Sequence, residues 1–242
     1  YAFTLLNARI TGGHTPSGSG AGLFKPTGGP WQAVTLRVFD SVFDNNHAIQ
    51  TAQDDGGGGL YVVGAAEFTL VRTRIADNSG ANGGGVYSLG SHLINLFDSE
   101  LADNHATGTG GNPGNGGNGG GLGVDGAQRH INLCRSRLID NDANAYGGGL
   151  FTVAYDQQSF VRLRDSLVQG NRSLGSSNAH TAGVYLQGGP FEIVGSSFIG
   201  NIADRGYGGL SLFNHGGISA SGLIVNSTFQ GNIALNGLGG AI

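Results

Sequence analysis

The sequence predicts an all-β fold: a right-handed parallel β-helix of about eight coils with about 30 residues per coil, formed by residues 1–242 as a single domain. The first observation is that glycine supplies 48 of the 242 residues, against a usual share of about 7%, while 38% of the residues are hydrophobic. The second is a six-residue sequence motif, a hexamer of residues, that recurs along the chain. The third is that apolar and polar residues alternate with period two, and a period of 3.6 is absent.

The hexamer reads Ser or Thr, any residue, an apolar residue, any two residues and Asn. It recurs every 26 to 37 residues and ends at Asn46, Asn78, Asn104, Asn141, Asn171, Asn201 and Asn232. Apolar residues stand three and eight positions before every one of these asparagines, beginning with Phe43 and Val38. Such a repeat cannot bury its apolar side alone, but stacked copies can. We therefore expect interior apolar columns and an asparagine ladder whose amides bond to each other and to the backbone.

A second motif, a run of small residues followed by an aliphatic residue, alternates with the hexamer. This motif predicts a corner where the backbones of neighbouring coils lie close together. Loops of variable length precede the motif in each coil. The residue after the aliphatic forms a column of Phe24, Tyr61, Tyr87, Gly123, Phe151 and Tyr185. Strand alternation turns these side chains outward. They either pack beneath the loops or form an aromatic strip that binds sugars or a protein partner.

Charged residues of alternating sign stand six positions before the asparagine on consecutive coils. They are Asp40, Arg72, Asp98, Arg135 and Asp165. Opposite charges that face each other across neighbouring strands stabilise that pairing. The pattern therefore predicts a charge ladder that fixes the register of the coils.

The best copies of the motifs resemble those of a known family. Residues 43–46, 198–201 and 229–232 match an FxxN motif, and residues 239–242 match a GGAI motif. Both are similar to the repeats of chlamydial polymorphic outer-membrane proteins and of related secreted bacterial β-helix proteins. The resemblance implies a parallel β-helix, an extracellular or bacterial cell-surface location, and an adhesin-like role.

The residue before the asparagine is aspartate on three consecutive coils, at Asp77, Asp103 and Asp140. These residues are either turn residues that bond their own backbone, ligands of a Ca²⁺ ion, or carboxylates of a glycosidase. We expect no other cofactor. Cys134 shares a column with Phe39 and Val71, among others, which we interpret as a core position.

Composition narrows the range of functions. A pI near 5.9 provides no basic field for nucleic acid, and no apolar run is long enough for a transmembrane helix. The chain begins at Tyr1 and contains no Met, so we expect it to be a segment of a longer protein.

No catalytic cluster converges in the sequence, so we expect a non-enzymatic structural or adhesive rod. Because neither end shows a polar cap, copies of the rod could stack end to end into filaments. The expected partner is therefore a second copy of the chain, or alternatively a glycan or a host surface. The alternatives are a carbohydrate-active enzyme, either a polysaccharide lyase or a glycoside hydrolase, and a carbohydrate-binding module.

Overall fold

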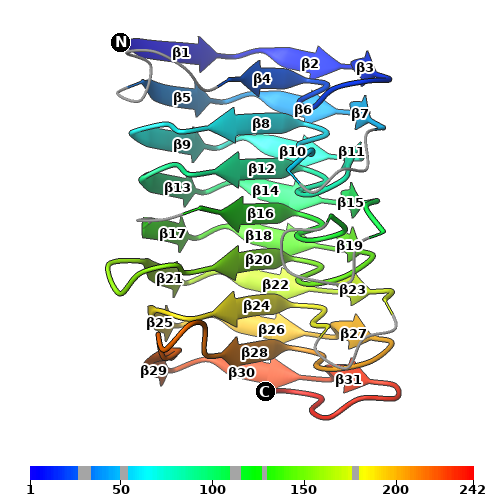
Figure 1. Cartoon of the computed structure of the whole chain (residues 1–242), viewed down its shortest axis with the longest axis vertical. Coiled ribbons are helices and arrows are strands. Elements are labelled where there is room, and N and C mark those ends of the chain that lie inside the picture. Colours follow the sequence, from blue (N-terminus) through cyan, green and yellow to red (C-terminus); the bar gives the residue numbers. More distant parts are fainter. Residues whose placement is uncertain (27–33, 50–53, 110–115, 127–129, 176–179) are drawn as a thin grey trace.

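The computed structural model describes residues 1–26, 34–49, 54–109, 116–126, 130–175 and 180–242. These residues form four parallel sheets, and each of the first seven coils adds one strand to each sheet in turn (Figure 1). Coil 1 runs from β1 to β4, coil 2 from β5 to β8, and so on to coil 8 with β29 to β31. The predicted parallel β-helix of about eight coils is confirmed.

The strands of the four sheets are short. Sheet A contains β1 (Ala2–Leu6), β5 (Thr35–Phe39), β9 (Glu67–Val71), β13 (Leu93–Phe97), β17 (His130–Cys134), β21 (Phe160–Arg164), β25 (Pro190–Val194) and β29 (Ser221–Val225). Sheet B contains β2 (Arg9–Thr11), β6 (Val42–Asp44), β10 (Arg74–Ala76), β14 (Glu100–Ala102), β18 (Arg137–Ile139), β22 (Leu167–Gln169), β26 (Ser197–Ile199) and β30 (Thr228–Gln230). Sheet C contains β3 (His14–Thr15), β7 (His47–Ala48), β11 (Ser79–Gly80), β15 (His105–Ala106), β19 (Asp142–Ala143), β23 (Arg172–Ser173), β27 (Ile202–Ala203) and β31 (Ile233–Ala234). Sheet D contains β4 (Leu23–Lys25), β8 (Leu60–Val63), β12 (Val86–Leu89), β16 (Leu122–Asp125), β20 (Leu150–Val153), β24 (Val184–Gln187) and β28 (Leu210–Phe213).

The interior is one continuous apolar core that follows the axis of the helix. Its columns are those that the hexamer spacing predicts: Leu70 pairs with Val38 on one side and with Leu96 on the other. Phe43 and Ile75 belong to a second such column, on sheet B, and both are fully buried. Burial of such columns provides the main driving force for a solenoid, because no single coil has a core of its own.

The chain turns between sheets at two positions per coil that adopt left-handed backbone geometry. The first lies between sheets A and B and has φ near 50° at Asp40, Arg72 and Asp98, among others. The second lies between sheets B and C and has φ of 51–57° at Asp77, Asp103 and Asp140. Asparagine, aspartate and glycine tolerate this conformation better than other residues do. It therefore explains much of the residue choice at these corners.

Candidate functional site

The asparagine ladder runs through coils 2 to 8 without a break. Each side-chain amide donates to Oδ1 of the asparagine on the next coil, over 2.7–3.0 Å. Each backbone N–H from Asn46 to Asn201 donates to the same oxygen at 3.0–3.1 Å. The amides also donate to backbone carbonyls, for example Asn104 to Ile75 at 2.9 Å. The predicted ladder is confirmed, and its side chains on coils 2 to 7 are buried.

A column of glycines packs directly against this ladder. A Cβ atom at Gly85 would lie 2.8 Å from the carbonyl oxygen of Gly121 and 3.0 Å from Cγ of Asn104. Gly59 and Gly149 are in the same situation on other coils. The glycine motif is therefore required because the backbone of each coil lies directly against the backbone of the next coil and against the side-chain amide of a ladder asparagine.

A second polar ladder explains the Ser or Thr that begins each hexamer. The backbone N–H of Ser99 donates to Oγ of Ser136 at 3.3 Å, and the N–H of Ser136 donates to Oγ of Ser166 at 3.2 Å. Each hydroxyl in turn donates to a backbone carbonyl, as Ser99 does to Phe97 at 2.9 Å. The sequence shows this column clearly, but its hydrogen-bonding role was not anticipated.

The charge ladder resolves into separate pairs. Arg72 forms a bidentate pair with Asp40, at 2.6 and 2.8 Å, and Arg135 forms the same pair with Asp98, at 2.7 and 2.9 Å. These hydrogen bonds hold the pKa of Asp40 and of Asp98 below the usual range. Asp165 instead leans toward coil 7, where the column holds a glycine.

The three aspartates Asp77, Asp103 and Asp140 are exposed at the left-handed corner between sheets B and C. Desolvation and the neighbouring charges of Asp77 and Asp140 raise the pKa of Asp103. Their φ values fit the interpretation as turn residues. Among the described residues, no three His, Cys, Asp or Glu side chains are placed to hold one metal ion. The geometry therefore gives the Ca²⁺ interpretation no support.

The aromatic column is stacked, but it is not a surface strip. Tyr61 and Tyr87 stack with ring centroids 5.4 Å apart, as Phe151 and Tyr185 do at 5.5 Å. These four side chains are at most 6% exposed, whereas Phe24 on the first coil is 51% exposed. Of the two interpretations of this column, the accessible aromatic strip is therefore wrong, and the burial of these rings fits the alternative in which they pack beneath other residues. The rings form a second apolar layer outside sheet D, where neighbours such as Tyr146 pack against them.

Two tyrosine hydroxyls in this layer differ in their hydrogen bonding. Tyr61 donates to the carbonyl of Asp54. The hydroxyl of Tyr87 is buried and has no hydrogen-bond partner within the described residues. Burial raises the pKa of both tyrosines, so both hydroxyls stay protonated.

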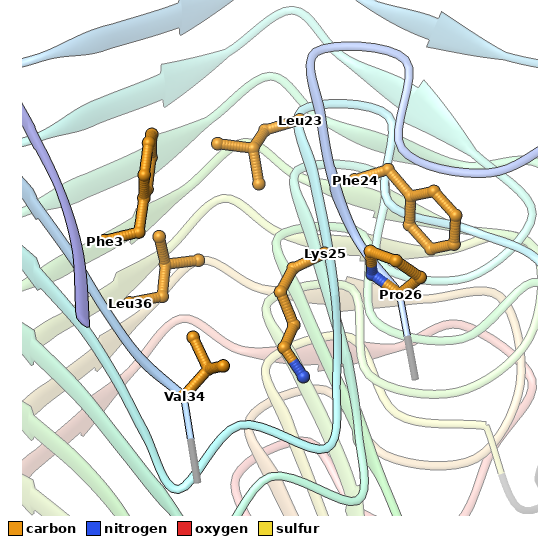
Figure 2. A pocket seen from close by; sticks show the side chains of 7 residues that line it. All are labelled: Phe3, Leu23, Phe24, Lys25, Pro26, Val34 and Leu36. Carbon is orange, nitrogen blue, oxygen red and sulfur yellow. The ribbon is translucent and has the colours of Figure 1, made fainter. Parts of the chain in front are cut away.

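A cavity of about 240 Å³ opens at coil 1 (Figure 2). Phe3, Leu23 and Leu36 surround it and continue the interior columns, since Phe3 pairs with Leu36 and Leu23 with Leu60. Phe24 lies on the opposite side of its strand and points away from Phe3 (Figure 2). This cavity is the open end of the apolar interior at the first coil.

Cys134 does not lie in the core. It is half-buried on the outer face of sheet A, one residue after the buried Leu133. The core interpretation is wrong because Cys134 and its column neighbour Phe97 face away from the interior. This face carries a hollow of about 280 Å³ lined by Phe97, Asn132, Cys134, Arg162 and Arg164. Sequence reasoning missed it because it assigned the column of Phe97 and Cys134 to the core, whereas this column, which also contains Arg164, faces outward.

Comparisons of the chain with known protein families, curated proteins and solved structures give no match. The part of the chain that the structure describes contains no helix able to cross a membrane.

Proposed function

We propose that the chain is a structural or adhesive rod, secreted or displayed at a bacterial cell surface. The observation that carries the proposal is the unbroken asparagine ladder, which ties coil 2 to coil 8 through hydrogen bonds that are buried as far as coil 7. Buried polar groups that are fully paired specify a single, rigid arrangement. A rod of this kind suits a scaffold that presents its long faces and loops to a partner.

The location rests on the repeat motifs. The FxxN copies supply Phe198 and Asn201 to the interior and to the ladder, and the motifs resemble those of bacterial surface proteins. The test is to label intact cells that express the full gene product with an antibody against the rod. Labelling of intact cells is expected, and labelling only after lysis would overturn surface display. Beads coated with the chain should also adhere to cells or to extracellular matrix, and the absence of adhesion to every surface tested would overturn the adhesive role.

A carbohydrate-active enzyme is the second candidate, and the raised pKa of Asp103 between Asp77 and Asp140 favours it. A carboxyl group with a raised pKa is suited to act as a general acid. Incubation with a panel of acidic polysaccharides separates the two proposals. Turnover that is lost in Asp103→Ala would establish the enzyme and overturn the non-enzymatic rod.

End-to-end stacking of the 242-residue chain into filaments is part of the proposal. The two end coils expose apolar side chains of the interior columns, among them Phe3 at 50% and Ile242 at 53%. Stacking would cover them, but it would place the Asn232 amide opposite Gly13, which has no side-chain acceptor. We therefore expect weak, concentration-dependent association in sedimentation velocity. A chain that stays monomeric at millimolar concentration would overturn the stacking.

A further inference from the structure

The hollow on the outer face of sheet A arises from side-chain size along one column. Cys134 pairs with Phe97 on β13 and with Arg164 on β21. A small side chain therefore lies between two large ones, which are two strand spacings or roughly 9.6 Å apart. Asn132, in the neighbouring outward column, forms the rest of the floor and pairs with Arg162.

The two arginines of the hollow are held in place. Arg162 donates from Nε to Oε2 of Glu192 at 3.0 Å, and Arg164 donates from Nη2 to Oε1 at 2.9 Å. The Arg162 guanidinium also lies 5.2 Å from the centre of the Phe160 ring. A guanidinium has five N–H donors, so each arginine keeps donors beyond those given to Glu192. Groups fixed in advance lose less entropy when a ligand binds.

The other walls of the hollow supply different chemistry. Phe97 is half-buried, so part of its ring faces the solvent above the hollow. Asn132 donates from Nδ2 to Oδ1 of Asn95 at 3.0 Å, which leaves its own Oδ1 as an acceptor for a ligand hydroxyl. At the edge, Arg135 donates from Nη1 to Sγ of Cys134 at 3.3 Å and neutralises Asp98.

These groups together match a ring that has an apolar face, hydroxyls and a carboxylate. We propose that the hollow binds a uronate residue of an acidic polysaccharide. Its carboxylate accepts hydrogen bonds from Arg162 and Arg164, since guanidinium and carboxylate are complementary in shape. Its C–H face lies against Phe97, and a ring hydroxyl donates to Asn132. The volume of about 280 Å³ suits a single sugar ring. This inference rests on the proposed adhesive function and names its ligand.

The test is calorimetric titration of the 242-residue chain with trigalacturonate. Arg164→Gln and Phe97→Ala are each expected to weaken binding at least tenfold. Arg37→Gln is the matched control, because Arg37 lies on the same sheet and pairs with Glu67 at 2.9 Å, and it should stay within twofold of the wild type. Circular dichroism checks that each variant is folded.

Neutral maltotriose, a sulfated trisaccharide and a glutamate-rich peptide complete the ligand set. Binding to trigalacturonate alone supports the proposal. No binding of trigalacturonate, equal binding of the peptide or the sulfated sugar, or binding undiminished in both variants would overturn it. Bead adhesion distinguishes the uronate-binding site from the adhesive function. If Arg164→Gln beads adhere as wild-type beads do, the uronate site is wrong and the adhesive rod is retained. If wild-type beads adhere to nothing, the adhesive function falls, and the titration still decides the site.

Discussion

The side-chain amide of Asn104 donates to Oδ1 of Asn141 on the next coil at 3.0 Å, and to the carbonyl of Ile75 at 2.9 Å. Its own Oδ1 accepts from the backbone and the side chain of Asn78 at 3.1 and 3.0 Å. Asn104 is 1% exposed. One side chain therefore links three coils, because it bonds to buried groups on the coil before its own and on the coil after it.

Asn104→Ala should lower the free energy of unfolding by about 3 kcal/mol, because it leaves buried donors and acceptors unpaired. For a chain of this length that corresponds to a fall of roughly 6–12 °C in the melting temperature followed by circular dichroism. Asn232→Ala is the control, since Asn232 is half-exposed and water can replace its bonds. A loss at Asn232 as large as that at Asn104 would contradict the argument from burial.

Arg135 and Arg137 should respond to glycine in opposite ways. Arg135 has φ of 49°, a conformation that costs an ordinary L-residue roughly 1–2 kcal/mol but costs glycine almost nothing. Arg137 begins the regular strand β18, where glycine is unfavourable. Arg135→Gly should therefore melt at a higher temperature than Arg135→Ala, and Arg137→Gly at a lower temperature than Arg137→Ala. The same order at both positions would show that backbone strain does not decide residue choice at the corner.

Two aspartates should give opposite effects of pH on stability. The pKa of Asp103 is raised, so its charged form destabilises the folded state at neutral pH. Asp103→Asn should therefore be more stable than the wild type at pH 7, and the difference should vanish as the pH falls through the raised pKa toward the ordinary 3.8.

Asp98 has a lowered pKa because Arg135 bonds to it, so its charged form stabilises the folded state. Asp98→Asn should be less stable at pH 7, and that deficit should fade only below pH 3.8. Urea denaturation at a series of pH values measures both differences. If both variants are more stable than the wild type at pH 7, or both are less stable, the opposite pKa shifts given to Asp103 and Asp98 are wrong.

The two stacked tyrosines give a fourth prediction. Tyr87→Phe removes a buried hydroxyl without a partner among the described residues and should stabilise the chain by about 1 kcal/mol. Tyr61→Phe leaves the Asp54 carbonyl without its donor and should destabilise it. Thermal melts of both variants test the pair, and destabilisation by Tyr87→Phe would show that its hydroxyl has a partner after all.

The repeat made the fold and the asparagine ladder predictable, because coils that stack in register turn a spacing in the sequence into a contact in space. Alternation within a strand was enough to place Phe39 and Cys134 outside, since Val38 and Leu133 point inward. The burial of Tyr87 could not be predicted in this way. It depends on residues that cover sheet D from outside, and a periodic column does not show where they run.

The left-handed corners were also hidden from the sequence. Aspartate at Asp77 and Asp103 suits both a turn and a metal site, and only the φ values distinguish a backbone requirement from a ligand set. Arg72 and Arg135 obscured the signal further, because arginine is not a residue typical of that conformation. The hollow beside Cys134 is built from two columns of the repeat, since Phe97, Cys134 and Arg164 stand seven positions before ladder asparagines, and Asn132 and Arg162 stand nine positions before them. The repeat places these residues side by side, but it does not show that a small side chain between two large ones leaves a hollow.

The asparagine ladder also gives the rod a net dipole along its axis. Every amide from Asn46 to Asn201 donates toward the next coil, so their dipoles point the same way and add along the axis, as peptide dipoles do in an α-helix. The positive end of the ladder lies at coil 8 and the negative end at coil 2, where Oδ1 of Asn46 faces coil 1. A partner that binds at one end of the ladder therefore meets the opposite potential from a partner that binds at the other end. Two rods that stack end to end favour the same orientation, whereas two rods that lie side by side favour the reverse one.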